Sequence, residues 1–143
     1  MPNTAPENPI EVAVGIIFND NGQVLLSQRP EHVHQGGRWE FPGGKRESNE
    51  TMAAALHREL AEELGIDVLA ARPLLTVNHR YSDRQVVLDV WQVEHYLGEP
   101  TGREGQPLVW VALNELADWS LPAADRPIIE TLLKQAHNTQ QAS

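Results

Sequence analysis

The chain has 143 residues and no cysteine, and its 20 acidic and 11 basic side chains give a formal charge of −9 at pH 7. This length suits a single domain that folds without disulfide bonds, and the lack of cysteine excludes thiolate metal sites and a thiol nucleophile. The negative charge disfavours stable binding to nucleic acid or to an anionic membrane, and the longest apolar run, residues 12–18, is too short to span a bilayer, so we expect a cytoplasmic protein.

The predicted domain begins with two short strands. Residues 1–8 are polar and predict a flexible tail, which is followed by a single domain at residues 9–136. Residues 11–18 and 23–27 are rich in apolar and β-branched side chains, and the Asn-Asp-Asn-Gly sequence between them is typical of a tight turn. This pattern predicts a β-hairpin.

A glycine-rich loop and a helix follow the predicted hairpin. Residues 30–48 predict a loop around a short strand near Trp39. Residues 51–64 predict the clearest helix in the chain, because apolar side chains recur every four residues along it. Thr51 can cap the N-terminus of this helix, and Gly65 suits its C-terminal stop.

The second half of the chain predicts further strands and a closing helix. The strands are expected at residues 70–78, 85–96 and 108–112. Residues 127–136 predict an amphipathic helix with Asp125 as its N-cap, and residues 137–143 predict a polar, flexible tail. Strands on both sides of a central helix, with another helix at the end, indicate an α+β fold, an α/β/α sandwich with a mixed β-sheet between helices.

Three glutamates give the helix at residues 51–64 a second property. Glu59, Glu62 and Glu63 occupy positions i, i+3 and i+4, so they share one face of the helix, where like charges repel. A hard divalent cation would turn this repulsion into binding, because it favours several converging carboxylate oxygens. Arg58 could orient Glu62 through a charge-assisted hydrogen bond. Taken alone, the pattern also fits a solvated acidic helix face.

The sequence before this helix favours the metal interpretation. Residues 41–45 (FPGGK) form a glycine-rich turn, and glycine lets the backbone approach a phosphate or a metal closely. From Gly44 the chain fits the pattern G-x5-E-x7-R-E-U-x-E-E-x-G-U, in which U is aliphatic, and chance would give such a match in roughly one window in 10⁹. This pattern resembles the signature of the Nudix hydrolase family. The matching residues are Gly44, Glu50, Arg58, Glu59, Leu60, Glu62, Glu63, Gly65 and Ile66.

The resemblance implies a fold, a reaction and a cofactor. Nudix hydrolases share a mixed β-sheet between helices, and they hydrolyse a nucleoside diphosphate linked to another group with the help of Mg²⁺ or Mn²⁺. The metal ligands implied for this chain are the side chains of Glu59, Glu62 and Glu63 and the carbonyl of Gly43 or Gly44. By the same resemblance, Arg58 would hold the glutamates in place, and Glu50 would form a salt bridge or support the metal ligands.

The likeness extends over residues 11–133, to the branch of the family that hydrolyses 8-oxo-dGTP to 8-oxo-dGMP and pyrophosphate. In this branch water attacks the β-phosphorus, and the reaction prevents mutagenic incorporation of the oxidised nucleotide. The likeness makes Glu104, in the sequence EGQP, a further metal ligand or catalytic carboxylate. Glu59 and Glu104 are the candidates for the general base.

The same likeness implies a set of substrate-binding residues. They are Arg29, Glu40, Phe41, Lys45, Arg84 and Asp125. Arg29 would contact the α-phosphate, Phe41 and Arg84 would line the nucleotide pocket, and Asp125 would face the base. Simpler roles are also open. Arg29 could be a surface charge and Phe41 a core side chain. Arg84 could be a turn residue and Asp125 a helix cap.

Position 125 departs from the pattern of that branch, which has asparagine there. 8-Oxoguanine presents an N7–H donor beside the O6 acceptor, and the oxygen and NH₂ group of an amide can serve both. An ionised carboxylate can only accept, whereas a protonated Asp125 could imitate the amide at the cost of a raised pKa. Relaxed base selectivity is therefore open.

Two alternative functions also remain open. The substrate could be another nucleoside diphosphate derivative, such as an unmodified dNTP, ADP-ribose or a dinucleoside polyphosphate. These compounds fit the same signature, because the residues of the signature act only on the diphosphate. A non-catalytic regulator that binds nucleotides is the alternative from another class, although such a protein would be free to lose Glu59, Glu62 or Glu63. In each case the partner is a small-molecule nucleotide, and we expect a monomer.

Overall fold

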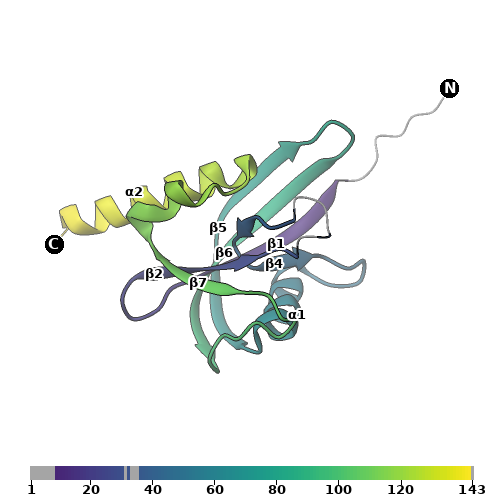
Figure 1. Cartoon of the computed structure of the whole chain (residues 1–143), viewed down its shortest axis with the longest axis horizontal. Coiled ribbons are helices and arrows are strands. Elements are labelled where there is room, and N and C mark those ends of the chain that lie inside the picture. Colours follow the sequence, from purple (N-terminus) through teal and green to yellow (C-terminus); the bar gives the residue numbers. More distant parts are fainter. Residues whose placement is uncertain (1–8, 31, 33–35, 143) are drawn as a thin grey trace.

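The computed structural model describes residues 9–30, 32 and 36–142, and these form two β-sheets and two α-helices (Figure 1). The strands are β1 (Ile10–Ile17), β2 (Gln23–Gln28), β3 (Trp39–Glu40), β4 (Gly43–Lys45), β5 (Asp67–Arg80), β6 (Gln85–Leu97) and β7 (Leu108–Ala112). The α-helices are α1 (Met52–Leu64) and α2 (Arg126–Ala142), and the 3₁₀ helices η1 (Leu113–Trp119) and η2 (Ala123–Asp125) lie between β7 and α2. The predicted tail at residues 1–8 lies outside the described residues.

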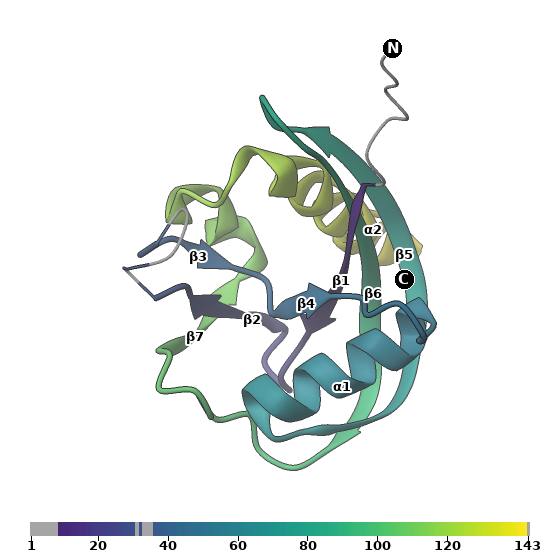
Figure 2. The same ribbon diagram turned by 90° about the vertical axis from the view of Figure 1, so that its right-hand side faces the viewer.

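The larger sheet has the strand order β4-β1-β6-β5, and the smaller sheet has the order β3-β2-β7. Strands β1 and β6 are parallel, whereas every other pair of neighbours is antiparallel. The larger sheet is therefore mixed, as predicted. Helices α1 and α2 pack on different parts of this framework (Figure 2), and the predicted α+β fold is confirmed.

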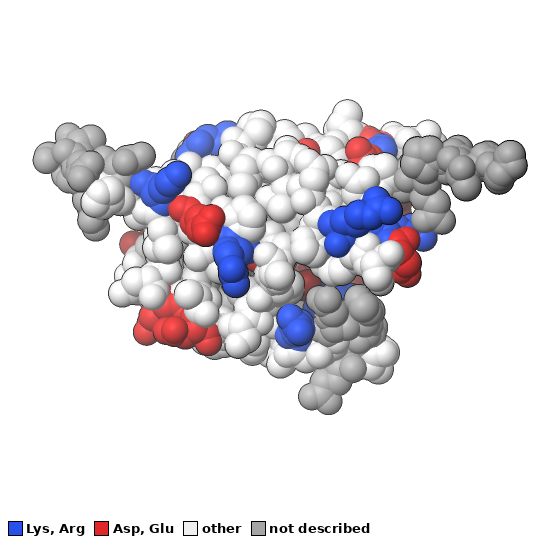
Figure 3. All heavy atoms as spheres, turned by 90° about the horizontal axis from the view of Figure 1, so that it is seen from above, with Lys and Arg blue, Asp and Glu red and all other residues white. Residues whose placement is uncertain are grey.

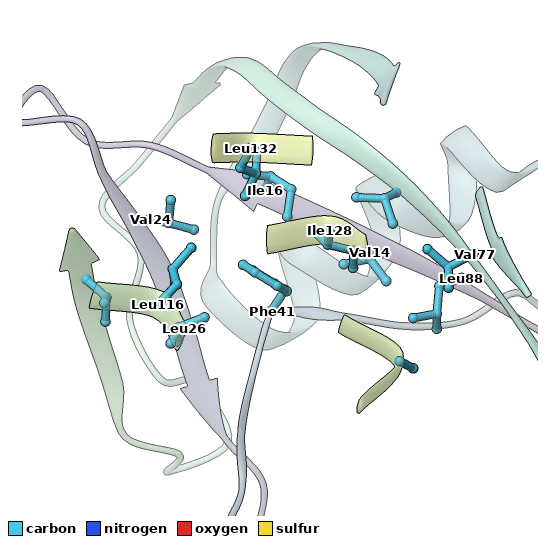
Figure 4. Packing of buried hydrophobic residues seen from close by; sticks show 13 residues of the cluster. Val14, Ile16, Val24, Leu26, Phe41, Val77, Leu88, Leu116, Ile128 and Leu132 are labelled. Atoms are coloured by element: carbon cyan, nitrogen blue, oxygen red, sulfur yellow. The ribbon is translucent and has the colours of Figure 1, made fainter. Parts of the chain in front are cut away.

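Strand β1 connects the two halves of the core, because alternate side chains of a strand point to opposite faces. Val14 and Ile16 belong to a cluster of buried apolar side chains that includes the inner face of α2 (Figure 4). Ala13 and Ile17 belong to a second cluster, which includes the leucines of α1. Each fully buried aliphatic side chain contributes about 1.5–3 kcal/mol, so these clusters fix both helices against the sheets.

The predicted hairpin between the first two strands forms only in part. Its turn is present, since the backbone N–H of Asn19 donates to the Gln23 carbonyl at 3.0 Å and the Asn19 side chain accepts from the Gln23 N–H at 2.9 Å. Beyond one bridge between Phe18 and Val24, however, β1 and β2 belong to different sheets. Strand β1 is buried on both faces and pairs instead with β4 and β6, contacts that the local sequence does not encode.

Helix α1 begins and ends where its capping residues predict. The Thr51 hydroxyl accepts a hydrogen bond from the Ala54 N–H at 3.0 Å, which satisfies one of the free donors of the first turn. Gly65 adopts a left-handed conformation with φ of 72°, and its N–H donates to the Ala61 carbonyl at 3.0 Å. Both caps confirm the prediction from the sequence.

Strand β5 and helix α2 are longer than predicted. Strand β5 starts at Asp67 rather than at residue 70, and it continues through Pro73, beside which its register with β6 shifts. A bulge of this kind accommodates a residue that lacks an N–H. Helix α2 continues to Ala142, so residues 137–142, predicted as part of a flexible tail, are helical because no proline or glycine stops the helix.

The described part of the chain contains no helix that is both long and apolar enough to cross a bilayer. On the face seen in Figure 3, Lys and Arg side chains lie in small, separate groups with Asp and Glu side chains among them. That face does not present the continuous basic surface on which nucleic-acid binding depends.

Candidate active site

Strand β4 brings the glycine-rich turn against helix α1 (Figure 2). Residues 43–45, predicted as loop, are held there by pairing with β1. The Gly43 N–H donates to a carboxylate oxygen of Glu63 at 3.2 Å. A Cβ atom at Gly44 would lie 2.2 Å from the carboxyl carbon of Glu59, and one at Gly43 would lie 2.0 Å from the Ala13 carbonyl oxygen. Gly43 therefore requires glycine, because a side chain there would meet backbone atoms, whereas a side chain at Gly44 would displace the Glu59 carboxylate.

Arg58 links the helix glutamates to Glu50. Its Nε and Nη2 atoms donate to the two oxygens of Glu50 at 3.0 and 2.6 Å, a bidentate pair. Its Nη1 atom donates to Glu59 at 2.9 Å and to Glu62 at 3.4 Å. Nη2 also donates to the Lys45 carbonyl at 3.0 Å, which ties α1 to β4. The structure thus brings these predicted site residues together around one guanidinium group.

The carboxyl groups of this cluster have contrasting pKa values. Hydrogen bonds from Arg58 lower the pKa of Glu50 to about 2. Burial raises the pKa of Glu63 to about 8, and the charges of neighbouring glutamates add to this effect. Burial also raises the pKa of Glu59, although the hydrogen bond from Arg58 opposes it. Ionising Glu59 and Glu63 together is therefore unfavourable unless a positive charge binds between them.

The donor set fits a hard divalent cation. It consists of carboxylate oxygens and a glycine backbone, which are the ligands that Mg²⁺ and Mn²⁺ prefer. Among the described residues, no three such side chains already converge around one point. The side chain of Glu62 is 56% exposed and Glu104 is also exposed, so both can rotate towards a cation held by the less exposed Glu59 and Glu63.

A cleft of about 510 Å³ lies beside this cluster. Its charged lining comes from four residues on separate segments: Arg29, Glu40, Glu63 and Glu104. Glu104 stands on the connection between β6 and β7, at residues 98–107, which reaches back to α1. The fold therefore places a carboxylate from this connection opposite the carboxylates of the helix.

A second, larger cleft of about 610 Å³ adjoins the first. Its polar lining includes the predicted residues Arg29, Glu40, Lys45, Arg84 and Asp125. Its apolar lining includes Val12, Val14, Phe41, Val86 and Leu88. The two clefts share Arg29 and Glu40, whose side chains approach to 3.4 Å. A ligand that occupies both clefts would pass this ion pair, with an apolar slot on one side and Glu63 and Glu104 on the other.

The larger cleft contains two acidic side chains, the buried Asp125 and the half-buried Glu40. Asp125 is only 7% exposed, and burial, followed by the charge of Glu40, raises its pKa to about 7. Burial also raises the pKa of Glu40, whereas the charge of Arg29 lowers it. Asp125, for which the sequence left both a cap and a pocket role open, lines the cleft from η2. Near neutral pH its carboxyl is therefore divided between the protonated and ionised forms.

The structure gathers all the predicted site residues into the Arg58 cluster or the two clefts. Sequence reasoning missed Tyr81 and His32, which line the larger and the smaller cleft respectively, and Gln106, which lines the smaller one. Tyr81 stands in the tight turn that ends at Arg84, where its N–H donates to the Arg84 carbonyl at 2.8 Å. The sequence offered one signal for Tyr81, because an aromatic residue three positions before the predicted pocket residue Arg84 is itself a candidate for the pocket.

A NUDIX domain model matches residues 13–131, most of the chain. The chain belongs to the Nudix hydrolase family. It is 39% identical to the 8-oxo-dGTP diphosphatase of Escherichia coli K12 over 86% of this chain and 95% of that protein. It is 40% identical to the CTP pyrophosphohydrolase of the same organism over 87% of this chain and 91% of that protein. A chain from a structural study of MutT from Aliivibrio salmonicida and Vibrio cholerae matches it with a TM-score of 0.78 and 36% identity, over 90% of this chain and 99% of that chain.

Membership of the Nudix family accounts for the glutamate cluster, because the fixed positions of the signature fall on β4, on α1 and on the segments beside them. Family membership alone does not determine which nucleotide base the protein prefers. Two relatives of nearly equal identity are named for different nucleotides. The base preference of this Nudix hydrolase depends on residues outside the signature, such as those that line the larger cleft.

Proposed function

We propose that this Nudix hydrolase cleaves 8-oxo-dGTP to 8-oxo-dGMP and pyrophosphate, and so keeps an oxidised, mutagenic base out of new DNA. The observation that carries the proposal is the pair of adjoining clefts, one lined by buried Asp125 and apolar side chains and the other by Glu63 and Glu104, which share Arg29 and Glu40. A nucleotide that occupies both clefts has its base at Asp125 and its phosphates beside Glu63. The enzyme would act as a monomer on the nucleotide pool of the cytoplasm.

The residues at the phosphate end have distinct roles in this proposal. Arg29 binds the α-phosphate from the junction of the clefts, and Lys45 adds positive charge at the rim. Glu59, Glu62, Glu63 and Glu104 would hold Mg²⁺ or Mn²⁺ together with the carbonyl of Gly43 or Gly44. The bound cation supplies neutralisation of phosphate charge and a more acidic water molecule.

Proton transfer and leaving-group departure complete the reaction. Glu59 or Glu104 accepts the proton of a water molecule that attacks the β-phosphorus. The bond from the β-phosphorus to the oxygen that bridges it to the α-phosphorus breaks, and that oxygen leaves with the nucleoside monophosphate. Arg58 keeps the glutamates in place through the hydrogen bonds described above.

A protonated Asp125 explains how the cleft can prefer the oxidised base. Its carbonyl oxygen accepts from the N7–H of 8-oxoguanine, and its O–H donates to O6. Unmodified guanine presents two acceptors on this edge, so the carbonyl oxygen of Asp125 would face a second acceptor without a hydrogen. Leaving polar groups unpaired in a buried site is the strongest form of discrimination between similar ligands.

The same carboxyl supports a second candidate substrate, CTP. Cytosine presents an N4–H donor beside the N3 acceptor, which is the same order of groups that 8-oxoguanine offers. The 40% identity to a CTP pyrophosphohydrolase also favours this candidate. Both substrates undergo the same reaction at the glutamates, so the choice between them depends on how the larger cleft fits a purine or a pyrimidine.

Hydrolysis of 8-oxo-dGTP in ¹⁸O-water tests the proposed reaction. We expect 8-oxo-dGMP and pyrophosphate as the products, with the label in pyrophosphate, because the attacking oxygen stays on the β-phosphorus. Label in the monophosphate would refute attack at this atom. Release of orthophosphate in place of pyrophosphate would refute the proposed class of reaction.

A further inference from the structure

The connection that carries Glu104 is anchored on the last carbonyl groups of helix α1. These carbonyls have no partner within a helix. The N–H of Thr101 donates to the Leu64 carbonyl at 2.9 Å, and the N–H of Arg103 donates to the Glu63 carbonyl at 3.0 Å. The connection thus replaces water at the end of the helix that bears the glutamates.

Gln106 adds two hydrogen bonds to this contact, one from each end of its side-chain amide. Its Nε2 donates to the Glu63 carbonyl at 2.9 Å, and its Oε1 accepts from the Glu104 N–H at 2.9 Å. One side chain thus bridges the backbones of two residues whose carboxylates line the same cleft. An ionised glutamate, the acid of the same length, could only accept and so could not make both hydrogen bonds.

Gly102 gives the bridge its space. A Cβ atom at this position would lie 2.0 Å from the Gln106 carbonyl oxygen and 3.3 Å from its Oε1 atom. The backbone at Gly102 therefore lies close to both the backbone and the side-chain amide of Gln106. Glu104 itself is exposed, so packing against neighbouring side chains does not fix its position.

We propose that Gln106 is a positioning residue, whose double hydrogen bond fixes the backbone of Glu104 against the end of α1 and so keeps the Glu104 carboxylate within reach of the cleft that Glu63 lines. The inference rests on the role proposed for Glu104. Glu63 and Glu104 line the same cleft, which fits a carboxylate kept near the helix glutamates. Groups that orient metal ligands in this way commonly affect metal affinity and turnover together.

The test replaces Gln106 with methionine, which keeps the length and shape of the side chain but removes both hydrogen bonds. Amide hydrogen exchange of the metal-free protein is measured first, and we expect faster exchange at the Glu104 N–H. Thr101→Val is the matched control on the same connection, because it removes only the hydroxyl contact with the Leu64 carbonyl, at 3.5 Å, and leaves the backbone hydrogen bond. Gln106→Asn keeps the amide but is too short to reach both partners, and it serves if the methionine variant does not fold.

Mn²⁺ binding by electron paramagnetic resonance and steady-state kinetics follow. We expect Gln106→Met to weaken Mn²⁺ binding and to lower kcat by about 10- to 100-fold, with KM changed by less than about threefold. In a Glu104→Gln background, the same change should lower kcat by less than about twofold, because the group that it positions is already disabled. Thr101→Val should match the unaltered protein in all three measurements.

Equal losses in both backgrounds would overturn the proposal, since Gln106 would then act independently of Glu104. Unchanged exchange at the Glu104 N–H, or unchanged Mn²⁺ binding, would also overturn it. If the unaltered protein hydrolyses no nucleotide, the proposed function fails, whereas exchange and Mn²⁺ binding still decide the role of the bridge.

Discussion

Replacing Asp125 with asparagine should remove a pH-dependent loss in the free energy of unfolding. The two side chains have nearly the same shape, but only aspartate can ionise. Burial and the nearby charge of Glu40 raise the pKa of Asp125 from 3.8 to about 7. This difference makes ionisation in the folded protein about 4 kcal/mol more costly than in the unfolded chain.

The sign of the effect follows from where the proton is bound. Below pH 3.8 both states of the protein hold the proton at Asp125, so this group adds no pH dependence. Between pH 4 and 7 the unfolded chain loses the proton while the folded protein keeps it, and the free energy of unfolding falls by about 1.4 kcal/mol for each pH unit. Above pH 7 both states are ionised, and the full loss of about 4 kcal/mol remains.

Urea denaturation of the metal-free protein at pH 5, 6, 7 and 8 measures this loss. We expect the free energy of unfolding, relative to that of Asp125→Asn, to fall by about 2–3 kcal/mol from pH 5 to pH 7 and to level off at pH 8. Glu63 titrates in both proteins, so the difference reports the ionisation of Asp125 together with its interaction with Glu40. Asp118→Asn, at an exposed site on η1, is the control and should differ from the unaltered protein by less than about 0.5 kcal/mol throughout.

Parallel stability curves for Asp125→Asn and the unaltered protein would refute this reasoning. They would mean that the Asp125 carboxyl reaches water or a cation in the folded protein. The explanation of base selectivity would then also fail, because it requires a neutral carboxyl in the larger cleft.

Three further predictions concern the phosphate end of the site. Glu62→Gln should lower kcat on the order of 100-fold or more with an unchanged urea midpoint, since this side chain is 56% exposed; near-normal turnover would remove Glu62 from the metal site. Gly44→Ala should weaken Mn²⁺ binding by about 10-fold or more, because the new methyl group would displace the Glu59 carboxylate, and unchanged binding would contradict the close approach at β4. Chelation with EDTA should abolish hydrolysis reversibly, with recovery on adding Mg²⁺ or Mn²⁺, and activity that persists in excess EDTA would contradict the metal requirement.

Local sequence signals predicted the elements whose geometry is local. Helix α1 is the best example, because its apolar repeat and both of its caps lie within the segment 51–65. The cluster of Arg58 and glutamates follows from the same helix, since residues four apart share a face. The Nudix signature could be recognised from the sequence because its fixed positions are concentrated in one continuous stretch.

Features that depend on distant parts of the chain were not predictable in the same way. The separation of β1 and β2 into two sheets depends on β6, which lies far along the sequence, and strand β4 exists only because β1 pairs with it. The burial of Asp125 near Glu40 brings η2 next to strand β3. The Gln106 bridge likewise requires the β6–β7 connection to fold back on α1. No periodic pattern marks any of these contacts.

The measurement that tests the central claim most directly is steady-state hydrolysis of 8-oxo-dGTP, dGTP and CTP by the purified protein with Mg²⁺, followed by pyrophosphate release. We predict a kcat/KM for 8-oxo-dGTP that exceeds that for dGTP by over about 100-fold, which corresponds to nearly 3 kcal/mol of discrimination in the larger cleft. A higher value for CTP than for 8-oxo-dGTP would assign the cleft to the pyrimidine. Equal values for 8-oxo-dGTP and dGTP would contradict the claim that Asp125 reads the oxidised base, and would leave only the Nudix chemistry at the glutamates.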